Sequence, residues 1–396
     1  MKIPISKTII SQEICEEVTK TLQSGWLVQG KKVKEFEERW CQFTGAQHSV
    51  AVTSCTSALE VSLRALGFGP GDEAIVPAFT WVSTANVVEL LGGKVKFCDI
   101  DLSTFNISTS MAKELITEKT KVILPVHLFG QCADMTNLMS IIKGKDIYVV
   151  EDAACGFGSY SEHNKHVGTI GNTGCFSFHP RKGITTGEGG MVTTNDKYLA
   201  DKIRCLRDHG AVTTDLQRHM GQKPYLLSDH VEAAYNMRMT DIHATLGCEQ
   251  MKFAEDILEE RRSIAEKYKK GIHWGNNLMH QRGNSAKHGY QSFACIFNPD
   301  ETEKAVMTKD IEKIGEINEK RNQLMEQLQV SGISTRPATH AVHMLKYYKD
   351  KYDIDECDFI CSKAANDCSI SLPLYNGITD NEIQYVIDKV NEYIKS

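Results

Sequence analysis

The sequence lacks the features that would place the protein in a membrane or on a nucleic acid. No stretch of its 396 residues approaches the roughly 18 continuous apolar residues of a membrane-spanning helix. Its beginning, MKIPISKTII, has no basic start followed by a long apolar run, as a signal peptide would. Positive charge is not in excess, because 45 lysines and arginines face 51 aspartates and glutamates, for a net charge of −6. We therefore expect a cytoplasmic protein whose partners include neither membranes nor nucleic acid.

Disulfide and metal patterns are missing as well. The 13 cysteines are odd in number and scattered, and no two of them form a CxxC pair. We therefore expect reduced thiols in apolar surroundings rather than a disulfide framework, and no metal site. The cysteines that stand in helix- or strand-like apolar contexts are Cys15, Cys41, Cys55, Cys98 and Cys175. The sequence shows no internal repeat, and its length allows two domains.

What the sequence does contain is a glycine-rich stretch, GCFSFHPRKGITTGEGGM at residues 174–191, around which the rest is organised. A strand-like run ends at Pro180 and places Lys182 in a loop of glycine and threonine. A lone lysine in such a loop is usually a solvated charge. However, Asp152 closes the apolar strand Ile147–Val150, and TSCTSALEVSLRALG places small hydroxyl residues at a helix start. A carboxylate for the ring nitrogen, an amine for the aldehyde and an anion site are what pyridoxal 5′-phosphate (PLP) requires.

Each supporting residue also has a purely structural explanation. Thr56 and Ser57 fall at a helix N-terminus, where free N–H groups favour an anion, but a simple N-cap is the alternative. Trp81 lies beyond the predicted strand Ala74–Pro77, at the edge where open α/β sheets bind ligands. It either stacks on a flat cofactor ring or packs in the core. A buried Asp152 requires a positive partner, and its alternative role is a helix cap on Ala153–Ala154.

Apolar periodicity predicts alternating strands and helices over the first two thirds of the chain, with a short antiparallel strand at Met191–Thr194. Because the candidate site residues stand at strand ends, this order favours a mostly parallel sheet flanked by helices. The remainder of the chain is less regular. We expect there a long charged helix at Glu255–Lys269, which joins the two domains, and strands at Tyr290–Phe297 and near Ile333–Arg336. We also expect a helix-rich charged segment at Thr302–Leu328 and a last helix at Asp380–Ile394.

Six motifs together resemble the DegT/DnrJ/EryC1/StrS family of sugar aminotransferases. In chain order they are VTSCTSAL, PAFTWVSTAN, LPVHLFGQCADM, EDAACGFGS, GCFSFHPRKGITTGEGGM and YNMRMTDIHATLG. The likeness runs over roughly residues 10–260 and resumes in STRPATHAVHMLKYY and ISLPLY. It implies fold type I of the PLP-dependent transferases. We expect a large α/β domain, 1–260, with a mostly parallel seven-stranded sheet flanked by helices, and a smaller α+β domain, 261–396.

The resemblance assigns cofactor roles residue by residue. Lys182 matches the lysine that bonds covalently to the cofactor aldehyde, and Asp152 matches the carboxylate partner of the pyridine nitrogen. Trp81 matches the aromatic residue stacked on the ring. The positions that match phosphate ligands are Thr56, Ser57 and Ser177.

Two positions connect the site to its surroundings, and two depart from the family pattern. Asn236 matches an asparagine that reaches the phosphate from the neighbouring subunit, which implies a homodimer with shared active sites. His343 matches a histidine of the substrate cleft. Cys55 stands in the phosphate loop where glycine is frequent, so we expect an ordinary backbone conformation there. Cys155 replaces a glutamine or histidine beside the cofactor's 3′-oxygen, and its thiol is a weak donor.

The resemblance implies a PLP-dependent aminotransferase that transfers an amino group, from glutamate, to a nucleotide-linked keto-sugar. Related sugar dehydratases carry histidine in place of the lysine, so Lys182 favours transamination. A dehydratase or a cyclitol aminotransferase on the same scaffold is the alternative among enzymes. A PLP-binding regulatory protein without turnover is the alternative from another class, because a fold does not fix function. The sequence has no added DNA-binding module or basic patch to support that class.

Overall fold

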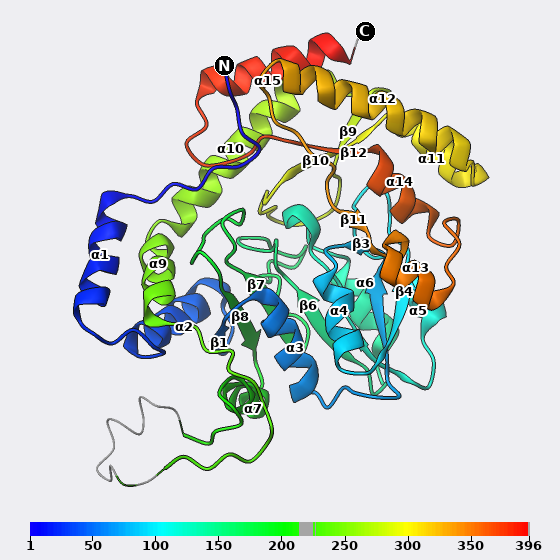
Figure 1. Cartoon of the computed structure of the whole chain (residues 1–396). Helices are drawn as coiled ribbons and strands as arrows, with labels where there is room; N and C mark the ends of the chain where they lie inside the picture. The colour runs from blue at the N-terminus through cyan, green and yellow to red at the C-terminus, as the bar shows by residue number, and fades with distance from the viewer. Residues whose placement is uncertain (214–224, 226, 395–396) are drawn as a thin grey trace.

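The computed structural model describes residues 1–213, 225 and 227–394, and its largest element is a seven-stranded sheet (Figure 1). The strand order is β1-β8-β7-β6-β5-β2-β4. These strands are β1 His48–Val52, β2 Glu73–Pro77, β4 Lys94–Cys98, β5 Thr120–Ile123, β6 Tyr148–Asp152, β7 Thr173–Ser177 and β8 Gly190–Thr194. Within this sheet only β8 runs against its neighbours β1 and β7, and the other pairs are parallel. The predicted mostly parallel sheet and its antiparallel strand are confirmed.

Helices cover both faces of this sheet (Figure 1), as the crossover connections of parallel strands require. In β1 the side chains alternate between two cores, because Val50 and Val52 join one cluster and Ala51 the other. Helices α3, α4 and α7 pack in the first core, and α2, α5, α6 and α9 in the second. Their bounds are α2 Lys31–Thr44, α3 Cys55–Ala65, α4 Ser83–Leu90, α5 Thr109–Leu115, α6 Met135–Ile142, α7 Lys197–Arg207 and α9 Asp241–Met251. No helix in the described parts of the chain has the length and apolar character needed to cross a membrane.

A third core forms around a small antiparallel sheet with the order β12-β10-β9. Its elements are α10 Ala254–Gly271, β9 Leu278–His280, β10 Phe293–Phe297, α11 Pro299–Thr308, α12 Ile311–Val330, α14 Ile360–Cys368, β12 Ser369–Leu372 and α15 Asp380–Tyr393. Helix α10 crosses the expected boundary at 260/261, and Ile3, close to the N-terminus, is buried in this core. The division into domains 1–260 and 261–396 stays a prediction.

Of two predictions for the C-terminal part, one is confirmed and one is wrong. The charged segment Thr302–Leu328 is helix-rich as predicted, and it forms two helices because Lys309 takes a left-handed conformation (φ 53°) and the Asp310 side chain caps α12. The segment Ile333–Arg336 forms no strand. Its two end residues each make only a single bridge, to different segments of the chain, so no continuous ladder develops.

The thirteen cysteines are all free, which confirms reduced thiols. Cys98 and Cys175 are buried, while Cys41 and Cys55 are half-buried. Cys15 was expected in the core but is exposed. It lies on the amphipathic helix α1, Gln12–Gln23, whose buried face carries its neighbour Ile14. Adjacent helical residues point about 100° apart, so Cys15 faces outward.

Two contacts join the elements around the small sheet to the large sheet near the ends of its strands. Strand β11, His340–Ala341, pairs antiparallel with β3, Phe79–Thr80. Asp99, which follows β4, accepts hydrogen bonds from the N–H groups of Cys361 (2.9 Å) and Ser362 (2.8 Å) at the start of α14. These contacts bring the residues that precede β11 over the carboxyl ends of the parallel strands.

Candidate active site

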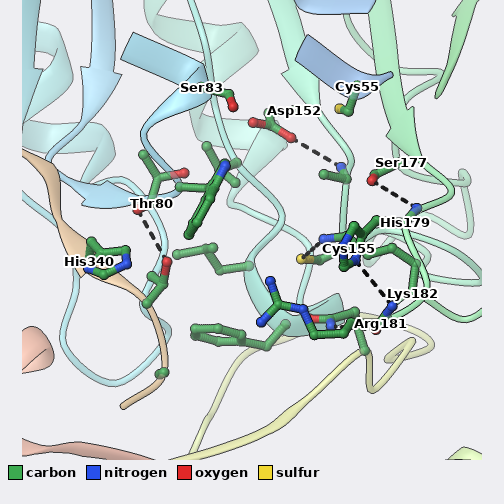
Figure 2. A pocket seen from close by; sticks show the side chains of 18 of the residues that line it. Cys55, Thr80, Ser83, Asp152, Cys155, Ser177, His179, Arg181, Lys182 and His340 are labelled. Atoms are coloured by element: carbon green, nitrogen blue, oxygen red, sulfur yellow. Dashed lines mark hydrogen bonds between the residues drawn. The ribbon is translucent and has the colours of Figure 1, made fainter. Parts of the chain in front are cut away.

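A cavity of about 660 Å³ opens at the carboxyl ends of the parallel strands, beneath the residues that precede β11 (Figure 2). Seven of the predicted site residues line it: Cys55, Thr56, Trp81, Asp152, Cys155, Ser177 and Lys182. Three others, Ser57, Asn236 and His343, are not among the lining residues.

Lys182 occupies the predicted loop after β7. Its backbone N–H donates to the carbonyl of His179 (2.8 Å), and its side-chain nitrogen lies 3.3 Å from the sulfur of Cys155. Figure 2 shows this contact within the cavity. Because a thiol is only a weak hydrogen-bonding partner, the amine remains free to bond to a ligand carbonyl.

Asp152 is a buried carboxylate at the end of β6, with 4% of its surface exposed. One oxygen accepts a hydrogen bond from the hydroxyl of Thr84 (2.8 Å) and the other from the N–H of Ala154 (3.1 Å). Burial raises the pKa of Asp152 above its ordinary value, although both hydrogen bonds and the charge of Lys182 oppose the rise. Among the described residues no cation forms an ion pair with this carboxylate, and no helix begins directly after it. The helix-cap explanation therefore does not account for it.

Helix α3 points its N-terminus at the cavity. The Ser54 hydroxyl caps the helix by accepting the N–H of Ser57 (3.1 Å), and the Thr56 hydroxyl donates to the hydroxyl of Ser83 (3.0 Å). The Ser57 hydroxyl is turned towards Ser54 (3.0 Å) instead of the cavity. Cys55 is the first residue of the helix and has no positive φ, so the expectation of an ordinary backbone there is confirmed.

Strands β7 and β8 close this end of the cavity. The hydroxyl of Ser177, the last residue of β7, accepts the N–H of His179 (3.4 Å). A Cβ atom added to Gly190 would stand 2.4 Å from the carbonyl carbon of Ser54. Because only glycine permits this close approach, the backbone of β8 packs directly against the start of α3, whose N-terminus and hydroxyls are suited to an anion.

Trp81 is 54% exposed and lines the cavity, so it is not a core residue. Its ring lies 5.6 Å from that of His340, with 47° between the ring planes. Trp81 follows β3, and His340 belongs to the paired strand β11. The two rings form one side of the cavity, where an aromatic face is available to a flat ligand.

The donor set fits PLP. A buried carboxylate with no cation accommodates a protonated ring nitrogen, the loop amine accommodates an aldehyde, and the hydroxyl-lined N-terminus of α3 accommodates a phosphate. Asp152, Lys182 and the α3 N-terminus line the same cavity. Within the described ranges, no group of three or more His, Cys, Asp or Glu side chains is placed to hold a metal ion.

Comparison with known proteins decides the family. The profile of the DegT/DnrJ/EryC1/StrS aminotransferase family matches residues 8–391. The chain belongs to this family. As a member it is a PLP-dependent sugar aminotransferase of fold type I, and PLP is its cofactor.

Relatives of this sugar aminotransferase match it over nearly its whole length. Spore coat polysaccharide biosynthesis protein SpsC of Bacillus subtilis (strain 168) is 36% identical, covering 99% of this chain and 97% of that protein. GDP-perosamine synthase of Escherichia coli O157:H7 is 33% identical, covering 99% and 98%. Among solved structures, the putative sugar aminotransferase Spr1654 from Streptococcus pneumoniae in its PMP-form aligns with a TM-score of 0.88 at 29% identity, covering 100% and 99%.

Asn236 is exposed on the surface of the sugar aminotransferase. Its side-chain oxygen accepts the N–H of Arg238 (3.3 Å). The next residue, Met237, accepts the N–H of Thr53 (3.0 Å) through its carbonyl, immediately before the hydroxyl-rich start of α3. The chain around Asn236 thus runs beside the start of its own α3, although its side chain does not line the cavity.

The assignment of His343 to the substrate cleft is not supported, because its side chain is 0% exposed and packs 5.0 Å from the ring of Phe359. Neither ring nitrogen has a hydrogen-bond partner of ordinary geometry among the described residues. His340, three residues earlier, is the histidine that lines the cavity. The pairing of β11 with β3 determines which histidine lines the cavity, because it holds His340 there and the chain turns inward after it.

The cavity also contains residues that the sequence reasoning missed. Ser54 carries a signal that the sequence holds, since it precedes the helix as an N-cap residue. Some of the remaining polar ones lie inside the quoted motifs and others outside them, but no local pattern assigned them a role, and only the fold shows that they line the cavity. They are Ser83, His179, Arg181, Glu188, Gln291, Arg321, Arg336, His340 and Asn366.

His343→Leu should make the protein's stability less sensitive to acid. Burial lowers the pKa of His343 to about 4 from its ordinary 6.5, so the unfolded chain takes up the proton first. The contribution of the neutral His343 ring to the free energy of unfolding is therefore fully present above pH 6.5, and it is lost as the pH falls towards 4. Between pH 7 and pH 5, urea unfolding should show the variant gaining about 2 kcal/mol relative to the wild type.

The exposed His273 provides the control, because His273→Leu should give the same stability difference from the wild type at both pH values. A constant difference for His343→Leu as well would show that the buried ring is protonated as easily as a free histidine.

Proposed function

We propose that this sugar aminotransferase transfers the amino group of glutamate to a keto-sugar carried on a nucleotide and releases the corresponding amino-sugar. The observation that carries the proposal is that Lys182 and Asp152 line one cavity together with the N-terminus of α3. The relative named GDP-perosamine synthase has a GDP-linked product in its name, which supports a nucleotide-linked substrate. Glutamate as the donor follows from the family resemblance.

Two side chains of the protein have different roles in the proposed reaction: Lys182 acts as the base, and Asp152 is the charge partner of the ring nitrogen. When bound, PLP supplies a carbonyl that exchanges amines and a ring that withdraws electrons from the reacting carbon. Lys182 would hold the cofactor through its amine, and this amine, when free, would take the proton from the donor's α-carbon, hold it as an ammonium and return it to the cofactor carbon that carried the lysine. Asp152 keeps a proton on the ring nitrogen, because a buried carboxylate favours a positive partner. The hydrogen bonds from Thr84 and Ala154 fix the orientation of this carboxylate.

The remaining cavity residues bind and orient. The free N–H groups of α3 and the hydroxyls of Thr56 and Ser177 bind the phosphate. Trp81 covers one face of the ring and limits the access of water to the reacting atoms. Cys155 contacts Lys182 (3.3 Å) and helps to position its amine.

Transamination is favoured over the alternatives because the base is a lysine. An amine can both hold the cofactor covalently and exchange with a donor amine, whereas the related dehydratases have histidine at this position. A dehydratase would release water without any donor, and a regulatory PLP-binding protein would turn over neither substrate. Formation of an amino product that depends on glutamate, read by mass spectrometry on a set of nucleotide-linked keto-sugars, separates the three.

We also propose a homodimer, working in the cytoplasm, in which each site receives Asn236 from the partner. The support is that Asn236 is exposed and lies beside the phosphate site without entering it. Large apolar side chains are exposed around it, including Val231 (64%) and Tyr235 (63%). Exposed apolar groups gathered on one segment are typical of a subunit contact.

Borohydride reduction of the PLP-loaded enzyme should fix the cofactor covalently to Lys182. Peptide mapping by mass spectrometry checks this, and a label on another lysine would contradict the assignment. Lys182→Ala should still bind PLP through the α3 site but should release no 2-oxoglutarate from glutamate. Lys197→Ala, which removes an exposed lysine paired with Asp201 (2.5 Å), should behave like the wild type.

Asp152→Asn should leave the fold intact, because the amide has the same shape and keeps an oxygen to accept the Thr84 hydroxyl. It should slow the release of 2-oxoglutarate in a single turnover roughly 100-fold or more, since the amide cannot balance a charged ring nitrogen. Asp196→Asn, at the exposed N-cap of α7, is the control for loss of one carboxylate. Near-normal rates for Asp152→Asn would show that this residue only stabilises the turn at Ala154.

Shared sites make a separate prediction. Lys182→Ala and Asn236→Asp proteins should each be inactive, the second because an aspartate places a like charge against the phosphate. After subunit exchange, one site of each hybrid dimer combines the intact Lys182 of one chain with the intact Asn236 of the other. Activity should therefore rise above the sum of the parents.

Exchange is verified independently by giving the two parents different tags and isolating the doubly tagged dimer. No recovery of activity in that dimer would show that Asn236 serves its own chain's site or none.

A further inference from the structure

Three arginines line the cavity without an ion pair among the described residues, and two of them, Arg181 and Arg336, also make no side-chain hydrogen bond to a described backbone carbonyl. Arg181 stands next to Lys182 in the sequence, and Arg336 comes from the segment that leads into β11. Among the described residues neither of them forms an ion pair, and the two acidic residues that line the cavity, Asp152 and Glu188, pair with neither. A guanidinium is always charged and has five N–H donors to satisfy, so this side of the cavity is suited to an anion.

Arg336 is more buried than Arg181. Its carbonyl accepts the N–H of Ser371 (2.8 Å), which fixes its backbone, while its guanidinium reaches only the hydroxyl of Ser292 at 3.4 Å. Its Nε is buried and has no hydrogen-bond partner among the described residues. Burial lowers the pKa of Arg336, and the charge of Arg181 lowers it further. A buried donor without a partner costs free energy, and a bound anion would remove that cost.

Arg181 is exposed but its backbone is fixed. Its N–H donates to Nδ1 of His179 (3.3 Å), and its carbonyl accepts the side-chain N–H of Gln291 (3.0 Å). Figure 2 shows the side chain extending from the Lys182 loop into the cavity. Arg321, the third cavity arginine, also has a buried Nε without a hydrogen-bond partner among the described residues, but its Nη1 donates to the carbonyl of Ser369 (2.6 Å) and so is committed to the protein backbone.

The position of Arg336 selects the kind of anion. Arg336 lines the same cavity as Cys155 and Lys182, and Cys155 contacts the side-chain nitrogen of Lys182 (3.3 Å). An amino donor carries a carboxylate on the very carbon whose amine displaces Lys182, so this carboxylate lies close to the lysine. The diphosphate of a nucleotide-linked sugar is separated from the reacting carbonyl by the sugar ring. A carboxylate also matches the planar fork of a guanidinium.

We propose that Arg336 binds the carboxylate next to the donor's reacting amine and that Arg181 binds a second carboxylate on the donor's side chain, so that the cavity selects a dicarboxylic amino acid. This assignment rests on the proposed aminotransferase function and adds the residues that determine donor specificity. The two roles differ in their consequences. Arg336 serves every amino acid donor, whereas Arg181 serves only donors with a second carboxylate.

The test uses ligands that bind without reacting. Glutarate has two carboxylates, butanoate has one, and neither has an amino group or a carbonyl to exchange. Isothermal titration of the PLP-loaded enzyme with each measures binding independently of turnover. Arg336→Gln should weaken glutarate and butanoate alike, by roughly 10- to 100-fold, as expected for loss of a charged hydrogen bond. Arg336→Lys keeps the charge but not the fork and should recover part of the affinity.

Arg181→Gln should weaken glutarate by roughly 3- to 10-fold, less because this side chain is exposed and screened, and should leave butanoate unchanged. In turnover the same variant should lose the preference for glutamate over alanine. Arg282→Gln removes one exposed positive charge that does not line the cavity, and it should bind both ligands as the wild type does. Thermal melting confirms that each variant is folded.

Three results would overturn the assignment. The first is failure of the wild-type enzyme to bind glutarate, and the second is unchanged glutarate affinity in Arg336→Gln. The third is loss of nucleoside diphosphate binding in that variant while glutarate binding persists, which would assign Arg336 to the sugar nucleotide. Release of 2-oxoglutarate from glutamate by the wild-type enzyme is measured alongside, so a failed donor site and a failed aminotransferase function give different outcomes.

Discussion

The burial of one carboxylate is the constraint on which this active site depends. Asp152 stands at the end of a parallel strand, almost wholly shielded from water, and no described cation pairs with it. Its neighbour Glu151, on the same strand, is equally buried but fully satisfied. Glu151 contacts His127 (2.9 Å) and accepts the N–H groups of Gly168 (2.7 Å) and Gly171 (2.6 Å). Side chains alternate along a strand, so β6 presents a fully hydrogen-bonded carboxylate on one side and a carboxylate that lines the cavity on the other.

The pKa values of Glu151 and Asp152 shift in opposite directions, in line with this difference in hydrogen bonding. Burial alone would raise both carboxyl pKa values, but the hydrogen bond from His127 and the backbone N–H groups lower the pKa of Glu151. Burial dominates for Asp152 and raises its pKa. A carboxylate that its own chain leaves unbalanced gains most from a positively charged ring nitrogen. Retention of PLP and the electron-withdrawing character of the bound ring then share one physical origin.

The parallel sheet accounts for how the remaining parts meet. All its parallel strands deliver their carboxyl ends to one edge, where Asp152 and Ser177 end their strands and Lys182 follows in the next loop. The small sheet's elements complete the cavity from the opposite side, because β11 pairs with β3 and Asp99 holds the start of α14. These two parts of the fold contribute different charged groups to the cavity. The large sheet contributes the lysine, the carboxylate and the helix end, while the residues preceding β11 contribute Arg336.

The sequence by itself determined the parallel sheet and the family, and it predicted residues that the fold brings to one cavity, because each depends on a local pattern: apolar strands, a carboxylate at a strand end, hydroxyls at a helix start. It misplaced His343, since the choice between His340 and His343 depends on the pairing of β11 with β3, which joins residues about 260 positions apart. It also missed Arg336, which the described residues leave without a carboxylate partner and with an unpaired Nε. A missing partner is a property of the folded surroundings, so only the tertiary structure could decide that this arginine is available to a ligand.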